Sequence, residues 1–133
     1  MVTRKREIGD LGEAIACKYL EGKGYVVLDR NYLKTFGEID IVARLNGKYH
    51  FIEVKTVTRE KISRVTGEMV RDEMYRPEEN LHPKKIERVL RTAQVYLVEN
   101  RLQDSDWQID AVTVTLESTS KRAVVEMISN IGV

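Results

Sequence analysis

Two carboxylates and a lysine in the first half of the chain have types and a spacing that allow them to act together. Asp40 lies in one apolar stretch, Glu53 and Lys55 lie in the next, and Asn46-Gly47 comes between the two stretches. That dipeptide is typical of a two-residue β-hairpin turn, which fixes the register of the strands. We therefore expect Asp40 opposite Glu53, and Glu38 opposite Lys55, on one face of a sheet.

This set of side chains suits the binding of a divalent cation. Opposed carboxylates repel each other and lower stability, whereas a cation between them reverses the effect. Magnesium takes one or two carboxylates together with water and phosphate oxygens. Lys55, on the same face, could polarise an attacking water or stabilise charge that develops on a phosphate.

The alternative is that the charged face of this hairpin is simply exposed to solvent, as one face of many antiparallel pairs is. Two features of the sequence favour a partly covered face instead. Val42 and Phe51 place apolar side chains beside the charges, and apolar residues fill the opposite face. The residues expected on that opposite face are Ile39, Ile41, Ile52 and Val54.

A further carboxylate comes from an amphipathic helix that we expect from Ile8 to about Gly22. On a helical wheel, Glu13 falls between Leu20 and Cys17, among residues expected to be covered. A covered carboxylate needs a partner or a metal ion. Glu13 is therefore a candidate metal ligand, unless it forms a structural salt bridge or reaches solvent at the edge of the helix.

A second helix, expected from Pro83, carries a basic stripe. Lys84, Arg88 and Arg91 have spacings that stack them on one face, and Lys85 lies beside them near the start of the helix. Such a stripe can follow the phosphates of a nucleic acid, although a solvated helix face gives the same pattern. The net charge of +1 does not by itself indicate a nucleic-acid-binding protein.

The remaining pattern predicts a single α/β domain over residues 1–133, in the order α-β-β-β-α-β-β. We expect a central mixed sheet flanked by helices, with a three-strand meander and a helix crossover to the fourth strand. Val57 to Asn80 is a polar excursion, for which we expect a helical turn. The expected strands are Tyr25–Tyr32, Glu38–Arg44, Lys48–Thr56, Trp107–Thr115 and Ala123–Ile128.

Composition narrows the class of protein. The single cysteine, Cys17, excludes an internal disulfide and a cysteine-rich zinc site, and its place on the helix predicts a core position. His50 and His82 are too few for a histidine-based site, and we expect a structural role for Asp110. No secretory signal or membrane span is evident, so we expect a cytoplasmic protein that makes no membrane contact.

The sequence resembles a known family at several points. Gly37-Glu38-Ile39-Asp40-Ile41-Val42-Ala43, followed by Phe51-Ile52-Glu53-Val54-Lys55-Thr56, resembles the PD-(D/E)xK nuclease motif. Gly9-Asp10-Leu11-Gly12-Glu13, Asp29-Arg30-Asn31-Tyr32 and Pro83-Lys84-Lys85 also match. Together these segments, which span nearly the whole chain, look like the YraN-like family of uncharacterised bacterial proteins. That family is related in fold to archaeal Holliday-junction resolvases.

The resemblance implies a restriction-endonuclease-like core with a magnesium or manganese site. By position, Asp40 and Glu53 would be the metal ligands, Lys55 the catalytic lysine, and Glu13 the additional helix carboxylate of resolvase-like members. The chain departs from the pattern in three places. Ile39 replaces the proline of the motif, Val57 stands where a basic residue usually follows, and the Val57–Asn80 excursion is longer than usual.

These observations predict a divalent-metal-dependent nucleic-acid phosphodiesterase that acts on DNA, with branched and flapped forms as the expected substrates. If the substrate is a four-way junction, we expect a symmetric homodimer. One alternative is a nucleic-acid-binding protein that shares the nuclease fold but does not cleave, as a partner in DNA repair or uptake. The other is a purely structural interaction protein in which the acidic cluster is incidental.

Overall fold

The computed structural model describes residues 3–60, 64–65, 68–69 and 83–132 of the 133-residue chain. Five strands form one mixed sheet in the order β1-β2-β3-β6-β7. The element order confirms the predicted α/β class. The bounds are α1 Arg4–Gly22, β1 Val26–Lys34, β2 Gly37–Leu45, β3 Lys48–Arg59, β4 Arg64–Val65, β5 Glu68–Met69, α2 Pro83–Glu99, β6 Trp107–Glu117 and β7 Ala123–Ile128.

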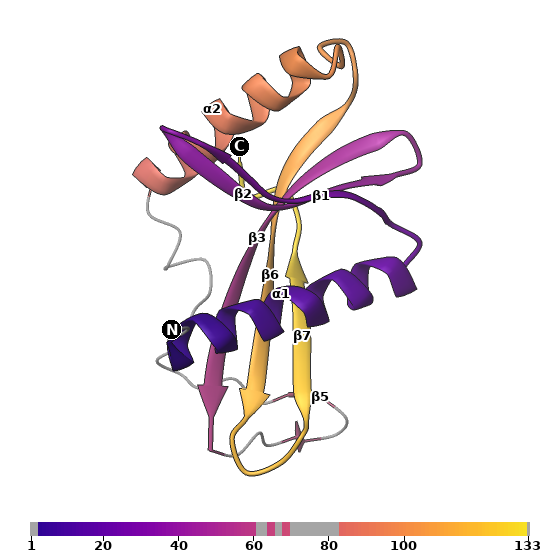
Figure 1. Cartoon of the computed structure of the whole chain (residues 1–133). Coiled ribbons are helices and arrows are strands. Elements are labelled where there is room, and N and C mark those ends of the chain that lie inside the picture. Colours follow the sequence, from indigo (N-terminus) through magenta and orange to yellow (C-terminus); the bar gives the residue numbers. More distant parts are fainter. Residues whose placement is uncertain (1–2, 61–63, 66–67, 70–82, 133) are drawn as a thin grey trace.

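The helices pack on opposite faces of the sheet and close two separate cores. Residues of α1 pack against one set of buried strand residues, which includes Ile41, Ile52 and Val112. Residues of α2 pack against another set, which includes Val42 and Phe51. Because neighbouring residues of a strand point to opposite faces, these two sets place α1 and α2 on different sides (Figure 1).

Both helices begin at residues that suit a helix start. The Thr3 hydroxyl accepts a hydrogen bond from the backbone N–H of Arg6, as a capping residue does. This cap starts α1 at Arg4, four residues before the position that the apolar pattern predicted. The second helix begins at Pro83, as predicted, because proline is suited to the first helical position.

The connections confirm the predicted meander and crossover. β1, β2 and β3 are antiparallel neighbours, and α2 carries the chain to β6, which pairs with β3 in parallel. β3 continues to Arg59, further than the expected end at Thr56, because β6 pairs with it from Tyr49 to Arg59. Within the excursion, β4 and β5 pair with each other, and the expected helical turn lies outside the described residues.

The β2–β3 hairpin has the predicted register near its turn but not near the acidic residues. Paired residues run from Leu45 and Lys48 to Ile41 and Ile52, where the ladder ends. The predicted pairing of Asp40 with Glu53 is therefore wrong as a ladder contact. Figure 1 shows the β1–β2 ribbon curving across the top of the sheet, while β3, β6 and β7 continue downwards behind α1.

The separation of the strands also changes which residues share a face. Ile39 was expected beside Ile41, but Ile39 packs in the core under α2 and Ile41 in the core under α1. Cys17 is buried in the core under α1, as predicted. In the part of the chain that the structure describes, no helix is long and apolar enough to cross a bilayer.

Candidate functional site

A cleft of about 910 Å³ opens where β2 and β3 separate. Its walls come from α1, the start of β2, the second half of β3 and the start of α2. All four side chains predicted for the catalytic or metal site line it, together with several cations. The charged lining residues are Glu13, Glu38, Asp40 and Glu53, and Arg4, Lys5, Lys55, Arg59, Lys85 and Arg88.

Asp40 is positioned by the backbone of the strand from which it separates. One carboxylate oxygen, Oδ2, accepts a hydrogen bond from the N–H of Val54 at 2.8 Å. The side chain thus takes the place of a ladder acceptor at the point where the ladder ends. Burial raises the pKa of Asp40 and the charge of Glu38 raises it further, while the Val54 hydrogen bond and Lys85 act in the opposite direction.

Glu53 is the most deeply placed carboxylate of the cleft, with 6% of its surface exposed. Its Oε2 lies 3.5 Å from the Nζ of Lys85, and its Oε1 is buried without a hydrogen-bond partner among the described residues. Burial, followed by the charge of Asp40, raises the pKa of Glu53 to about 8, even though Lys85 lowers it. A buried carboxylate with an unpartnered oxygen is costly.

Glu13 reaches the same cleft from the helix on the other side. Its Oε1 has no hydrogen-bond partner among the described residues and lies 3.8 Å from the guanidinium of Arg30. Burial and the charge of Asp40 raise the pKa of Glu13, and Arg30 and a hydrogen bond from Asn31 lower it. Glu13 therefore has features of both expected roles. It forms a long ion pair with Arg30, as a structural salt bridge would, and it lies close enough to Asp40 for the Asp40 charge to raise its pKa.

Gly12 lets α1 approach β3 closely enough to bring Glu13 to the cleft. A Cβ atom at Gly12 would lie 1.8 Å from the side-chain oxygen of Thr56, so any larger residue would push the helix away from the strand. The glycine beside Glu13 is thus required by packing. The same segment was part of the family resemblance, but the chain pattern alone did not reveal its contact with Thr56.

The two lysines of the cleft differ from expectation. Lys55 is exposed and lines the cleft, but the predicted pairing with Glu38 does not occur because the ladder ends before it. Lys85, which was predicted to bind nucleic acid, also lies next to Glu53, and half of its side chain remains exposed. Sequence reasoning missed Lys85, Arg30 and Asn31 as neighbours of the carboxylates. The only signal was that all three lie in segments of the family resemblance.

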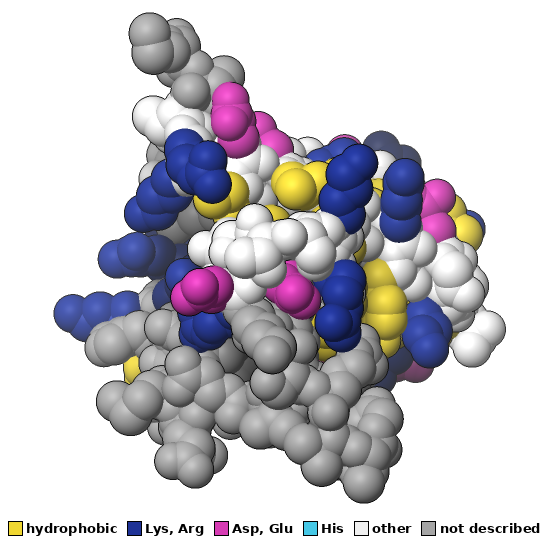
Figure 2. All heavy atoms as spheres, turned by 90° about the horizontal axis from the view of Figure 1, so that it is seen from below, with side chains coloured by type: hydrophobic (Ala, Val, Ile, Leu, Met, Phe, Trp, Pro, Cys, Tyr) yellow, Lys and Arg dark blue, Asp and Glu magenta, His cyan; other side chains and the backbone are white. Residues whose placement is uncertain are grey.

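The basic stripe of α2 is exposed, as expected, but it divides between two surfaces. Lys85 and Arg88 line the cleft, whereas Lys84, Arg88 and Arg91 line an adjacent groove. Figure 2 shows Lys and Arg side chains spread over the face seen from below, with acidic side chains among them. Basic residues of α1, β3 and α2 line the same cleft as the carboxylates.

The donor chemistry of the cleft fits a hard cation, although not as a cage of three carboxylates. Among the residues that the structure describes, no three His, Cys, Asp or Glu side chains lie close enough together to hold an ion. The predicted convergence of Glu13, Asp40 and Glu53 on one point is therefore not seen. The neighbouring pair of Asp40 and Glu53, with an unpartnered oxygen, matches the preference of magnesium for one or two carboxylates plus water and phosphate.

Comparisons with known proteins place the chain among similar bacterial sequences. Residues 12–114 match the model of "Uncharacterised protein family UPF0102". A protein of Campylobacter jejuni with that family name is 36% identical over 93% of this chain and 92% of its own length. A protein of Alkaliphilus oremlandii is 34% identical over 94% and 97%, and one of Clostridium botulinum strain Hall is 31% identical over 94% and 93%.

Proposed function

The chain belongs to the UPF0102 family, and we propose that it is a divalent-metal-dependent phosphodiesterase that acts on nucleic acid. The observation that carries this proposal is the buried, unpartnered oxygen of Glu53 next to Asp40, at the base of an open cleft with a basic rim. The resemblance to the PD-(D/E)xK motif assigns the same two residues.

Asp40 and Glu53 would hold the ion, which they approach from different strands, and Glu53 keeps an oxygen without a hydrogen-bond partner among the described residues. The Val54 N–H fixes Oδ2 of Asp40, which holds this carboxylate at a defined orientation. When bound, Mg²⁺ or Mn²⁺ neutralises phosphate charge and lowers the pKa of a coordinated water. Glu13 lies within electrostatic reach of Asp40 and would hold one of the outer waters.

The lysines would divide the remaining tasks. Lys85 lies against Glu53, so it offsets the like charges of the carboxylates when no cation is bound. Lys55 is exposed in the wall of the cleft, where its ammonium group can orient a water or stabilise charge on a phosphate oxygen. Arg88, which also lines the cleft, provides a contact for the phosphates on either side of the cut.

One specific observation favours the alternative of a binding protein without turnover. Asp40 and Glu53 lie together, but the structure shows no hydrogen bond or ion pair from Lys55 to either of them, and the third carboxylate stands apart. A protein of this kind would keep affinity for nucleic acid and for magnesium without hydrolysis. In the purely structural alternative neither ligand would bind.

The decisive experiment incubates the purified protein with linear, flapped and four-way DNA and with RNA, in magnesium, manganese or chelator. We expect metal-dependent cleavage, with DNA cut in preference to RNA and branched or flapped forms preferred. Lys55→Met should keep magnesium binding and lose cleavage. Binding of DNA and magnesium by the wild type without cleavage under any condition would favour the non-cleaving alternative. Sedimentation with and without a four-way junction tests the expected homodimer.

A further inference from the structure

A groove of about 1100 Å³ continues from the cleft between the tip of the β1–β2 hairpin and α2. Gly37, Glu38 and Arg88 line both the cleft and this groove, so the two form one continuous surface. The function proposed above uses only the cleft. The groove therefore offers a path for whatever leaves the cleft on this side.

The hairpin tip is held firmly against α2. A Cβ atom at Gly37 would lie 2.4 Å from Oγ1 of Thr92 and 3.1 Å from the carbonyl oxygen of Arg88. The Thr92 hydroxyl itself donates to that carbonyl at 2.7 Å. This close approach sets the position of the two residues that follow β1, Thr35 and Phe36, relative to the basic stripe.

The lining of the groove combines cations on one wall with exposed apolar surface on the other. Leu33 is 70% exposed, the largest fraction among the exposed large hydrophobic residues of the described chain. Phe36 is partly exposed, and the guanidinium of Arg91 lies 4.8 Å from the centre of its ring. Lys84 and Arg88 stand on the α2 wall beside Arg91.

We propose that this groove binds an unpaired single-stranded segment of nucleic acid that leaves the cleft. The phosphates would lie along Lys84, Arg88 and Arg91, and a base would stack at the hairpin tip on Phe36 and Leu33. Stacking on an aromatic ring next to a basic track is how proteins hold single strands without reading sequence. A duplex keeps its base faces covered, so the apolar tip would gain nothing from it.

The charge of the groove argues against an apolar peptide as the occupant. Its charged lining residues are Lys34, Glu38, Lys84, Glu87, Arg88 and Arg91, an excess of cations. Lys34 forms an ion pair with Glu99 at 2.6 Å, and we assign the contacts to an anionic chain to the cations of α2 that line the groove. The proposal thus deepens the proposed function by assigning its substrate an unpaired arm.

The test measures binding without cleavage, so that it does not depend on turnover. Glu53→Gln protein in chelator is titrated with a labelled oligothymidine and with a blunt duplex of equal length. Phe36→Ala should weaken binding of the single strand on the order of tenfold, because one stacked base is lost, and should change duplex binding less than twofold. Phe36→Trp should restore the affinity and show quenched tryptophan fluorescence upon binding.

Leu28→Ala is the control, because Leu28 is an exposed apolar residue of β1, the strand that precedes Phe36, and lies outside the groove. It should leave single-strand binding unchanged, and thermal unfolding shows whether each variant is folded. Equal losses on single strand and duplex, or no loss in Phe36→Ala, would overturn the groove assignment. Selective loss in Phe36→Ala would support it even if the wild type cleaved nothing, in which case only the proposed phosphodiesterase activity would fail.

Discussion

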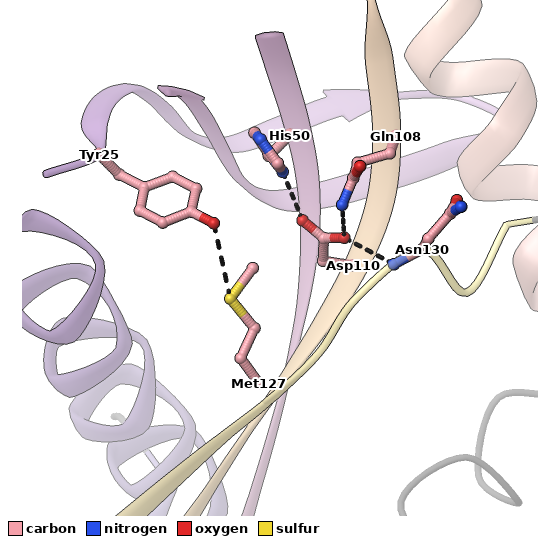
Figure 3. Close-up of polar contacts among 6 residues, drawn as sticks. All are labelled: Tyr25, His50, Gln108, Asp110, Met127 and Asn130. Atoms are coloured by element: carbon pink, nitrogen blue, oxygen red, sulfur yellow. Dashed lines mark hydrogen bonds and ion pairs between the residues drawn. The ribbon is translucent and has the colours of Figure 1, made fainter. Parts of the chain in front are cut away.

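Glu53 and Asp110 are buried carboxylates on adjacent parallel strands, yet their surroundings are opposite. Asp110 is fully buried, and both of its carboxylate oxygens have hydrogen-bond partners. Oδ2 lies 2.6 Å from Nδ1 of His50. Oδ1 accepts from the side-chain amide of Gln108 at 2.6 Å and from the N–H of Asn130 at 2.8 Å. Figure 3 shows these groups converging on Asp110. Glu53 retains an unpartnered oxygen and a single long contact to Lys85.

The satisfied carboxylate has a structural task. Asp110 ties the C-terminal segment to β6 through Asn130, and the N–H of Ile131 donates to the carbonyl of Ile109 at 2.7 Å just beside it. The Tyr25 and His50 rings pack in a T-shaped arrangement, with 5.1 Å between the ring centres. The comparison indicates that burial alone does not mark a functional carboxylate. A buried carboxylate oxygen that faces a cleft without a hydrogen-bond partner does mark one, because such an oxygen lowers stability and would not be retained for stability alone.

The largest expected difference between the two regions is in cleavage, measured after each carboxylate is neutralised in turn. Asp40→Asn and Glu53→Gln should each lower the rate at least ~10²–10³-fold, the usual cost of one lost electrostatic contact in a transition state. Asp110→Asn should keep the rate per folded molecule within a few-fold. Glu117→Gln is the matched control, since Glu117 also has a buried unpartnered oxygen but lies outside the cleft. Undiminished cleavage in Asp40→Asn or Glu53→Gln would remove that residue from the site.

Stability should show the reverse order. Asp110→Ala leaves His50, Gln108 and the N–H of Asn130 without their acceptor, which should lower the free energy of unfolding by roughly 3 kcal/mol. Glu53→Gln replaces a buried carboxyl whose charged form is disfavoured beside Asp40, so it should leave the metal-free protein equally or more stable. Urea unfolding in chelator measures both. A larger loss in Glu53→Gln than in Asp110→Ala would mean that the roles are assigned the wrong way round.

Magnesium should act on one region and not on the other. The wild type should gain about 2.7 kcal/mol of stability when the ion is present at a hundred times its dissociation constant. Asp40→Asn should lose most of that gain while its metal-free stability is equal or higher, and Asp110→Asn should keep the full gain. Thermal unfolding of the three proteins, with magnesium and with chelator, measures this. Lower metal-free stability of Asp40→Asn together with an unchanged magnesium response would contradict a metal site at Asp40.

The features that could be predicted from the sequence are the local ones, namely the strand register near a turn and the positions of the helices. A two-residue turn at Asn46-Gly47 leaves little freedom of register, so the pairs from Leu45–Lys48 to Ile41–Ile52 followed from it. Periodicity located both helices for the same local reason. The carboxylates that the sequence proposed for the site all line the same cleft.

The non-local parts could not be predicted in this way. The end of the ladder depends on the Asp40 side chain replacing a backbone acceptor, which no alternating pattern encodes. The contact of Lys85 with Glu53 joins α2 to β3, and the contact of Gly12 with Thr56 joins α1 to β3. His50 was set aside as too isolated for a site, and its pairing with Asp110 became visible only when β3 and β6 lay side by side.

The last expected effect concerns pH, and it follows from the pKa of Glu53. The pKa of this carboxyl is about 8 in the metal-free fold, well above the ordinary value for glutamate, so the folded state retains a proton that the unfolded chain releases. The stability that this proton contributes is fully present below the pKa of Glu53 in the unfolded chain, and it is lost as pH rises through the pKa of Glu53 in the folded protein. Between these limits, the free energy of unfolding should fall by at most about 1.4 kcal/mol per pH unit. Glu53→Gln should flatten this slope, whereas Asp110→Asn should leave it in place.

Because a metal ligand must be deprotonated, the apparent affinity of the wild type for magnesium should rise over the same interval and level off above about pH 8. Urea titrations in chelator and calorimetric magnesium titrations at pH 6, 7, 8 and 9 measure both slopes. An affinity that did not change with pH, together with a stability that did not fall, would show that Glu53 is already ionised at neutral pH and would leave its unpartnered oxygen without the role proposed for it.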